Sequence, residues 1–416
     1  MITLYLVTLI IAPQLWIEPF VGLRTDFIIY PLWLIYLISR GKHNQLLKFN
    51  VQDAFFLLMI FWIFVTTAAN DTNSLTTKIL VDYVKWFLLY RLTAATLATD
   101  DGIIKATRPM IFLVFIIVIE SIQHHFDPIG IGWAGQPLGW VDQSVLDAGG
   151  VGRTQWINIF DGPGVFCVMF TLILPFILIK FDQVFTAKQR IFAAILLLPL
   201  LIAIWFTGSR GGFLATLAII GAYTMSRLKI SFYTMMRAGV LLVIIYAMAP
   251  TYLTEIKDEN RSAQHRVDMW QEGMEMVEQN PVFGIGKGNF RIYTGRLIAH
   301  NSFIEIMGET GAIGVIFWLG LLYLSFKTIY LYMQLEEDPV RLSYARGLSL
   351  CLIGYLASSF FVTLEYETLY FILGFTRSMS LNKNIDLGYK LKDFRNIVLI
   401  LLGLYLMLKI FIRLYY

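Results

Sequence analysis

Long apolar runs constrain the fold of this chain more than any other feature. A helix that crosses a lipid bilayer needs about 20 apolar residues, and several runs in the chain reach or approach that length. Of the 416 residues, 57% are hydrophobic and 15% are charged, whereas charged residues make up about 25% of an ordinary soluble domain. We therefore predict an all-α, polytopic membrane protein. The clearest runs are residues 103–122, 165–179, 191–206, 240–248 with their flanks, and 315–333.

The distribution of Lys and Arg predicts the topology. Basic residues cluster in six short segments, and the positive-inside tendency places all of them in the cytoplasm. The resulting alternation starts with the N-terminus inside and gives about 12 spans of about 20 residues each, with a thirteenth possible near 398–412. Residues 2–15 are interpreted as a retained span because they lack a signal-peptide n-region and cleavage site. The six basic segments are 40–48, 105–108, 180–190, 227–237, 341–346 and 377–395.

This topology makes residues 1–416 a single integral membrane domain. Its predicted external segments are 18–26, 70–77, 123–156, 208–212 and 250–301. Cys167 and Cys351 lie in apolar runs and are expected to be small buried hydrophobes without a disulfide or metal role. His124 and His125 fall in the external segment 123–156 and have no acid or cysteine at ligand spacing, so we interpret them as loop residues.

The last external segment, 250–301, is unusually basic and is predicted to be a helical loop that carries the functional residues. A helix over 262–279 would place Trp270, Gly273 and Val277 on one apolar stripe. Arg266 lies on that stripe and away from the acidic face, so it needs a partner from elsewhere. That partner is either an anionic ligand or a structural ion pair. The basic residues of the segment are Lys257, Arg261, Arg266, Lys287, Arg291 and Arg296, and its own acids offer the alternative of simple neutralisation.

Arg210 shows a similar anomaly between two apolar runs that have almost no loop between them. It stands in the sequence Gly208-Ser209-Arg210-Gly211-Gly212. An arginine at a membrane boundary can simply extend its charged end into water. Glycines beside it also permit close approach of the backbone, and exposed N–H groups next to a guanidinium form a plausible phosphate site.

His300 lies where the polar segment meets the next apolar run. Ser302 and Glu305 fit a capping box, which would place His300 just outside a helix N-terminus. Histidine is the base of physiological pH, and here it lies close in sequence to arginines without an evident partner. Glu305 and Glu309 are one helical turn apart, and acids within a span are candidates for function as well as for capping.

Several short motifs occur along the chain in an order that resembles the O-antigen ligase and O-antigen polymerase superfamily. The firm resemblance covers residues 200–315. Gly152-Arg153, followed by Asp161-Gly162-Pro163, is similar to a further region of that family in which Asp-Pro-Asn is more usual. The motifs are Gly208-Ser209-Arg210-Gly211-Gly212, Arg266-Val267-Asp268-Met269-Trp270, Asn280-Pro281-Val282-Phe283-Gly284-Ile285-Gly286, His300-Asn301-Ser302-Phe303 and Glu309-Thr310-Gly311.

The resemblance implies a GT-C-type glycosyltransferase in the bacterial inner membrane, with its active site facing the periplasm. Such enzymes transfer a glycan from undecaprenyl diphosphate to an acceptor hydroxyl. Lipid A–core is the acceptor we expect first, as for an O-antigen ligase. A growing polysaccharide repeat unit or a protein hydroxyl are the alternatives within the superfamily. No cofactor and no nucleic-acid partner are expected.

The residues fit that chemistry. Arg210 and Arg266 would stabilise the charge that grows on a diphosphate leaving group, and His300 would accept the proton of the attacking hydroxyl. We expect a metal-independent, inverting, one-step displacement. The rival class is a transporter of lipid-linked sugars, for which internal repeats and polar groups at the membrane midplane are typical; a non-catalytic assembly subunit is a further alternative. Further candidate substrate-binding residues are Arg153, Arg291, Arg296, Asn301 and Glu305.

Overall fold

The computed structural model describes residues 1–70, 73–126, 140–141, 153–228, 257–295 and 298–415. Apart from one two-stranded antiparallel pair, these residues form helices and the segments that join them. The strands are β1 (Trp140–Val141) and β2 (Thr154–Gln155). The helices are α1 (Ile2–Leu6), α2 (Thr25–Ser39), α3 (His43–Leu47), α4 (Val51–Ala69), α5 (Asn73–Leu97), α6 (Gly102–Phe126), α8 (Pro163–Leu178), α9 (Ala187–Phe206), α10 (Arg210–Leu228), α12 (Lys257–Gln279), α13 (Phe290–Tyr293), α14 (Ser302–Leu335), α15 (Pro339–Ser359), α16 (Glu367–Asn382) and α17 (Leu391–Tyr415).

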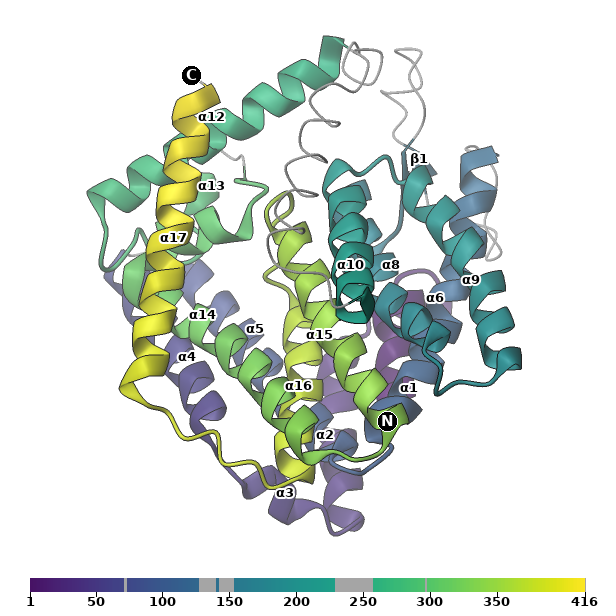
Figure 1. Cartoon of the computed structure of the whole chain (residues 1–416). Helices are drawn as coiled ribbons and strands as arrows, with labels where there is room; N and C mark the ends of the chain where they lie inside the picture. The colour runs from purple at the N-terminus through teal and green to yellow at the C-terminus, as the bar shows by residue number, and fades with distance from the viewer. Residues whose placement is uncertain (71–72, 127–139, 142–152, 229–256, 296–297, 416) are drawn as a thin grey trace.

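The long helices form one bundle around α16, most of whose side chains are buried (Figure 1). The helix α16 packs along α5, while α15 packs against α8 and α10, and α14 packs against α4. The helix α12 lies across the upper end of the bundle and contacts α14 and the peripheral helix α17. Helix α12 is amphipathic and polar overall, which suits a helix at the edge of the bundle better than one inside it.

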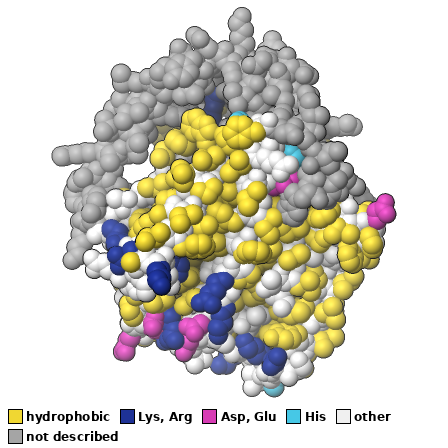
Figure 2. Space-filling view, turned by 90° about the vertical axis from the view of Figure 1, so that its right-hand side faces the viewer, with side chains coloured by type: hydrophobic (Ala, Val, Ile, Leu, Met, Phe, Trp, Pro, Cys, Tyr) yellow, Lys and Arg dark blue, Asp and Glu magenta, His cyan; other side chains and the backbone are white. Residues whose placement is uncertain are grey.

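Many large apolar side chains are exposed on the outside of the bundle, in addition to those that form its core. Six helices among the described residues are long and apolar enough to cross a membrane: α4, α6, α8 with its 3₁₀ extension, α9, α14 and α17. On α9 the exposed side chains include Phe192, Ile195 and Leu198. Figure 2 shows a broad hydrophobic band on the face that α9 borders, with Lys and Arg gathered below it. This pattern is typical of a surface that faces lipid.

The described parts of the predicted cytoplasmic basic segments lie at the lower end of the bundle in Figure 1. Asp182 is the centre of one group: its carboxylate pairs with Arg227 of α10 and with Arg346 of α15. Arg341 lies near Asp101, at the start of α6. Segments far apart in the sequence are therefore held together at one end by ion pairs.

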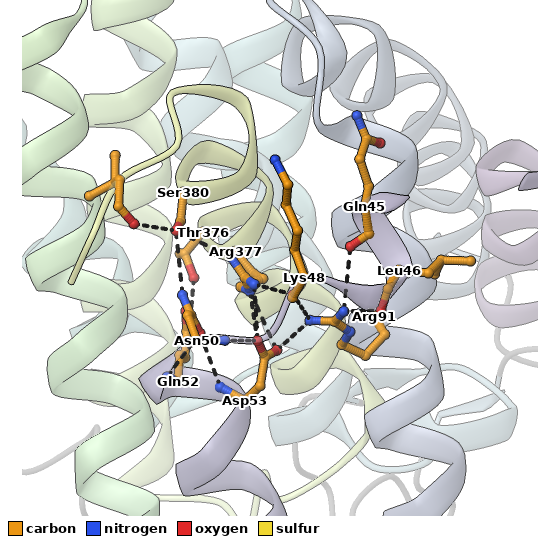
Figure 3. Close-up of polar contacts among 11 residues, drawn as sticks. Gln45, Leu46, Lys48, Asn50, Gln52, Asp53, Arg91, Thr376, Arg377 and Ser380 are labelled. Atoms are coloured by element: carbon orange, nitrogen blue, oxygen red, sulfur yellow. Dashed lines mark hydrogen bonds and ion pairs between the residues drawn. The ribbon is translucent and has the colours of Figure 1, made fainter. Parts of the chain in front are cut away.

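A second group at this end is built on three buried charged side chains, Asp53, Arg91 and Arg377 (Figure 3). The Asp53 carboxylate accepts hydrogen bonds from Arg91 of α5 at 2.7 Å and from Arg377 of α16 at 3.1 Å. Both guanidinium groups also donate to the carbonyl oxygen of Lys48. Because the charges and the backbone carbonyls satisfy one another, we assign this group to structure, joining α4, α5 and α16.

The two ends of the bundle are about 28 Å apart, since α10 runs for 19 residues at 1.5 Å per residue. Its last turn contains Arg227, which joins the basic end through Asp182. Its first residue is Arg210. The Gly208–Gly212 turn is therefore at the end opposite the basic segments, as the charge distribution predicts.

Several predicted elements differ from the structure. Residues 2–15 are not one helix: a π-helical turn over Val7–Ile11 ends at Ala12, whose φ is 53°, and a 3₁₀ turn follows over Pro13–Leu15. The helix predicted over 262–279 begins earlier, at Lys257. The predicted span at 240–248 lies outside the described residues.

The interpretation of His124 and His125 as loop residues is wrong, because α6 continues through both of them to Phe126. His124 is buried and lies 3.2 Å from the Glu120 carboxylate one turn earlier. The His125 ring stacks on Phe206 at 3.6 Å between centroids. Helical packing between α6 and α9 therefore extends beyond the apolar run that defined the predicted span.

Candidate active site

Three helix N-termini come together at the end of the bundle opposite the basic segments. They belong to α8, α10 and α14. A Cβ at Gly164, in the first turn of α8, would lie 3.9 Å from the Ser209 hydroxyl, which precedes α10. It would also contact Val362, whose carbonyl oxygen accepts a hydrogen bond from Ser302 at the start of α14. Helix N-termini carry unpaired N–H groups and partial positive charge, so their convergence favours an anionic ligand.

Arg210 is the first residue of α10. The hydroxyl of Ser209 caps this helix by accepting a hydrogen bond from the Gly212 N–H at 3.1 Å. A cation at a helix N-terminus is repelled by the helix dipole. The arginine is therefore placed against its local electrostatic preference, which indicates a role beyond stabilising the helix.

Arg266 of α12 completes a group of three arginines. Its pKa is held below the ordinary value by partial burial, by Arg153 and by Arg210. The Arg153 side chain lies against Gly208, where a Cβ would be 3.0 Å from its Cγ. Within the described residues Arg266 has no ion pair with a carboxylate, so the structural ion pair considered above is not found there. Guanidinium groups held near one another repel, and an anionic ligand would reduce that repulsion.

The apolar stripe of α12 places this helix against the start of α14. Trp270 is buried, and its indole Nε1 donates to the carbonyl oxygen of Ala299 at 2.8 Å. Gly273 lies against Ile304, where a Cβ would overlap that side chain. The stripe predicted from the sequence therefore packs as expected, and its tryptophan holds the residue immediately before His300.

His300 lies beside the arginines. Burial, followed by the charges of Arg266 and Arg291, lowers the pKa of His300 to about 4. The imidazole is therefore neutral at neutral pH. Its backbone has a φ of 49°, an uncommon conformation for a residue with a side chain, and such conformations gather at functional sites.

The capping box predicted for Ser302 and Glu305 is wrong. Asn301 is the N-cap of α14, and its side-chain oxygen accepts from the N–H groups of Phe303 and Ile304 at 3.0 and 3.2 Å. Ser302 instead joins α14 to the segment before α16, accepting from the Leu364 N–H at 2.8 Å. Asn and Ser are both good caps, and the one that precedes the first helical residue takes the role.

The structure places the remaining candidate substrate-binding residues differently. Asn301 is buried, and its Nδ2 has no hydrogen-bond partner in the part of the chain that the structure describes. Glu305 accepts a hydrogen bond from Thr363 at 2.7 Å and lines a cavity together with Arg291. Arg296 lies outside the described residues. The structure thus brings Arg153, Arg210, Arg266, Arg291 and His300 to one region, with Asn301 and Glu305 directly next to it.

A break in α14 explains why the motif over residues 280–286 contains glycine. Residue Gly311 leaves the helical conformation with a φ of 61°, and the Gly284 turn docks against the break. A Cβ on either glycine would overlap the backbone of the facing segment. Two backbone hydrogen bonds hold the docked segment. The Ile285 N–H donates to the carbonyl oxygen of Gly308 at 3.0 Å, and the Ala312 N–H donates to that of Pro281 at 2.9 Å.

Sequence reasoning missed the ion cluster that reinforces this docking. The Lys287 ammonium group lies 2.6 Å from Glu309 and 2.7 Å from Glu365. Burial tends to lower the pKa of Lys287, but these carboxylates hold it above the ordinary value. Glu309 also accepts from the N–H groups of Gly288 and Phe290. The sequence feature that could have indicated this cluster is Glu365, an acidic residue within the apolar C-terminal third of the chain.

The chemistry available here is the binding of an anion next to a neutral base. Among the described residues no group of three His, Cys, Asp or Glu side chains is arranged to hold a metal ion. Positive charge at the site comes instead from guanidinium groups and helix N-termini, which bind phosphate oxygens well.

The chain is similar to a known protein family over part of its length. Residues 192–319 match the O-antigen ligase family model. The match runs from α9 to the first half of α14, and it includes Arg210, Arg266 and His300. It supports the resemblance to the O-antigen ligase and polymerase superfamily that the motifs indicate. Together with the apolar helices it supports a glycosyltransferase-like, multi-pass membrane protein that acts on lipid-linked glycans. No curated protein matches the chain.

Proposed function

We propose that this protein transfers a glycan from undecaprenyl diphosphate to an acceptor hydroxyl at the periplasmic face of a bacterial inner membrane. The observation that carries the proposal is the group Arg153, Arg210 and Arg266 beside a neutral His300. The arginines fit a diphosphate, and the histidine fits a hydroxyl that must lose its proton. Lipid A–core is the acceptor expected first for an O-antigen ligase, with a repeat unit or a protein hydroxyl as alternatives in the same superfamily.

The proposed reaction is one displacement. The acceptor oxygen forms a bond to the anomeric carbon as the bond from that carbon to the diphosphate oxygen breaks. The acceptor proton passes to His300, and the departing electron pair stays on the diphosphate, where arginines offset the new charge. Attack from the face opposite the leaving group inverts the anomeric centre.

Reconstitution tests the proposal directly. The purified chain in vesicles would receive an undecaprenyl-diphosphate-linked glycan and lipid A–core or repeat-unit acceptors. We expect a new glycosidic product and free undecaprenyl diphosphate in equal amounts. Movement of the donor across the bilayer without any product would contradict the proposal and favour a transporter.

We propose a GT-C-type arrangement with about 12 spans of about 20 residues each. Besides the six apolar helices, the less apolar α5, α10, α15 and α16 pack lengthwise in the same bundle. Their lower hydropathy is consistent with an interior position, because a helix surrounded by protein does not need a lipid-compatible surface. Residues 250–301 would form the periplasmic segment that carries the site.

Labelling with a membrane-impermeant thiol reagent tests this orientation. Single cysteines at Glu275 of α12 and Lys188 of α9 would be introduced into a chain without Cys167 and Cys351, both of which are buried. Glu275 and Lys188 are exposed at opposite ends of the bundle. We expect Glu275→Cys to react from the periplasmic side and Lys188→Cys only after the membrane is opened. Reaction of both from the same side would contradict the topology.

Transfer is expected to proceed without a divalent metal, because the arginines of the proposed site could themselves offset the diphosphate charge. The purified enzyme should therefore keep its rate in excess EDTA. A loss of rate that magnesium or manganese restores would contradict this prediction.

A further inference from the structure

A cavity of about 230 Å³ lies next to the proposed active site. Three separate elements line it: α5 contributes Lys78 and Asp82, the segment after Lys287 contributes Gly288 and Arg291, and α14 contributes Glu305. It is adjacent to the proposed catalytic base, because Arg291 is one of the charges that act on His300. The donor arginines Arg153 and Arg210 are not among its lining residues.

The polar groups of this cavity are only partly used by the protein. Within the residues that the structure describes, neither Lys78 nor Arg291 has a hydrogen bond or an ion pair. One oxygen of Glu305 accepts from Thr363, and one oxygen of Asp82 pairs with Lys85 at 2.8 Å. The second oxygen of each carboxylate has no hydrogen-bond partner in the same residues. Two donor groups and two acceptor groups are therefore available to a ligand.

We propose that this cavity binds the acceptor, and that the acceptor is a neutral sugar residue. A sugar hydroxyl both donates and accepts, so one ring can satisfy carboxylates and cations together. A phosphorylated group fits less well, because the carboxylates of Asp82 and Glu305 would repel it. Glu309 forms another wall, but it is already occupied by Lys287 and two backbone N–H groups. The volume is below the about 300–1,000 Å³ of pockets for drug-sized ligands, which fits one sugar residue.

This inference rests on the proposed transfer reaction and adds a location for its specificity. Lys78 and Asp82 belong to α5, outside the matched segment 192–319. Two of the three donor arginines, Arg210 and Arg266, would thus lie in the family segment, while part of the acceptor site comes from the N-terminal third. Enzymes with the same donor chemistry could then select different acceptors by changing α5.

The test uses the full-length protein and a neutral disaccharide glycoside as probe, beside its 6-phosphate and a serine-containing peptide. Binding is measured directly, and transfer is measured with the lipid-linked donor. We expect the wild type to bind the neutral glycoside best. Asp82→Asn and Lys78→Ala should each raise the dissociation constant and the acceptor KM about tenfold or more, as for other hydrogen bonds to charged groups, without changing the donor KM.

Asp26→Asn is the matched control. It removes the other carboxylate partner of Lys85 but does not line the cavity, so it should leave the acceptor KM unchanged. A similar effect in this control, an unchanged dissociation constant in both cavity variants, or preference for the phosphorylated glycoside or the peptide would overturn the proposal. Transfer to another acceptor without binding of the neutral glycoside would do the same, yet would leave the proposed function intact. Absence of transfer to every acceptor would instead contradict the proposed function.

Discussion

Replacement of His300 by alanine is expected to slow glycan transfer about 10²–10⁴-fold, the usual contribution of a general base. Donor binding should change little, because the proposed diphosphate contacts come from Arg153, Arg210 and Arg266. His300→Gln keeps hydrogen bonding but cannot accept a proton, so it should be nearly as slow. The measurement is product formation by each variant beside its affinity for the lipid-linked donor. His43→Ala, an exposed histidine at the other end of the bundle, serves as the control.

The pH profile should distinguish a base from a residue that only positions the acceptor. The free enzyme holds the pKa of His300 at about 4, and Arg266 contributes to that depression. A bound diphosphate would offset the arginine charge and so raise the pKa of His300. Protonation would then begin at a higher pH in the complex.

We therefore expect the acid limb of kcat, which reports the complex, to lie at higher pH than the acid limb of donor kcat/KM, which reports the free enzyme. The pH profiles of kcat and of donor kcat/KM for His300→Gln should both lack this acid limb. Normal turnover by His300→Gln would show that the base lies elsewhere, and Glu305 would be the next residue to test.

Removal of Arg210 or of Arg266 should weaken use of the lipid-linked donor about 10–150-fold, from about 1.5–3 kcal/mol for a hydrogen bond to a charged group. The effect of Arg210→Ala and of Arg266→Ala should appear in donor kcat/KM. Neither variant should unfold, and Arg266→Ala in addition removes the repulsion of Arg266 by Arg153 and Arg210. Thermal unfolding without donor would check this, and a small gain in stability is expected for Arg266→Ala.

Lysine at either position should restore activity only in part, because an ammonium group cannot reproduce the planar, two-pronged contact of a guanidinium with phosphate. Arg346→Ala is the matched control, since Arg346 pairs with Asp182 at the basic end. Full activity of both Arg210→Ala and Arg266→Ala would contradict the proposed diphosphate site. A loss of donor use by Arg346→Ala of the same size would point to a general effect of lost charge.

The sequence predicted best where local pattern and packing agree. The stripe containing Trp270 on α12 is buried against the start of α14, as its spacing predicts. The turn between α9 and α10 is as short as the Gly-rich motif requires. The proximity of Arg210 to Arg266 is also found, although the expectation rested only on charge and on the predicted topology.

Contacts between distant segments could not be predicted in the same way. The cluster of Lys287 with Glu309 and Glu365 joins positions far apart in the chain, and no local period reveals such a meeting. The choice of Asn301 over Ser302 as N-cap depends on which residue leaves the helical conformation first. Tertiary contacts of Ser302 with the segment before α16 contribute to that choice.

The interruption of α14 at Gly311 also divides the helix into a part next to the proposed site and a part long enough to cross a bilayer. Helix α14 has 34 residues, or about 51 Å of helix, which is longer than the about 30 Å hydrocarbon core of a bilayer. A continuous rod would respond to a thicker or thinner membrane by tilting as a whole, and its upper end would move most. Because the helix is interrupted after Thr310, the lower part can tilt while residues 302–310 remain fastened to the Gly284 turn. We therefore expect the position of His300 to depend less on membrane thickness than it would at the end of an uninterrupted helix.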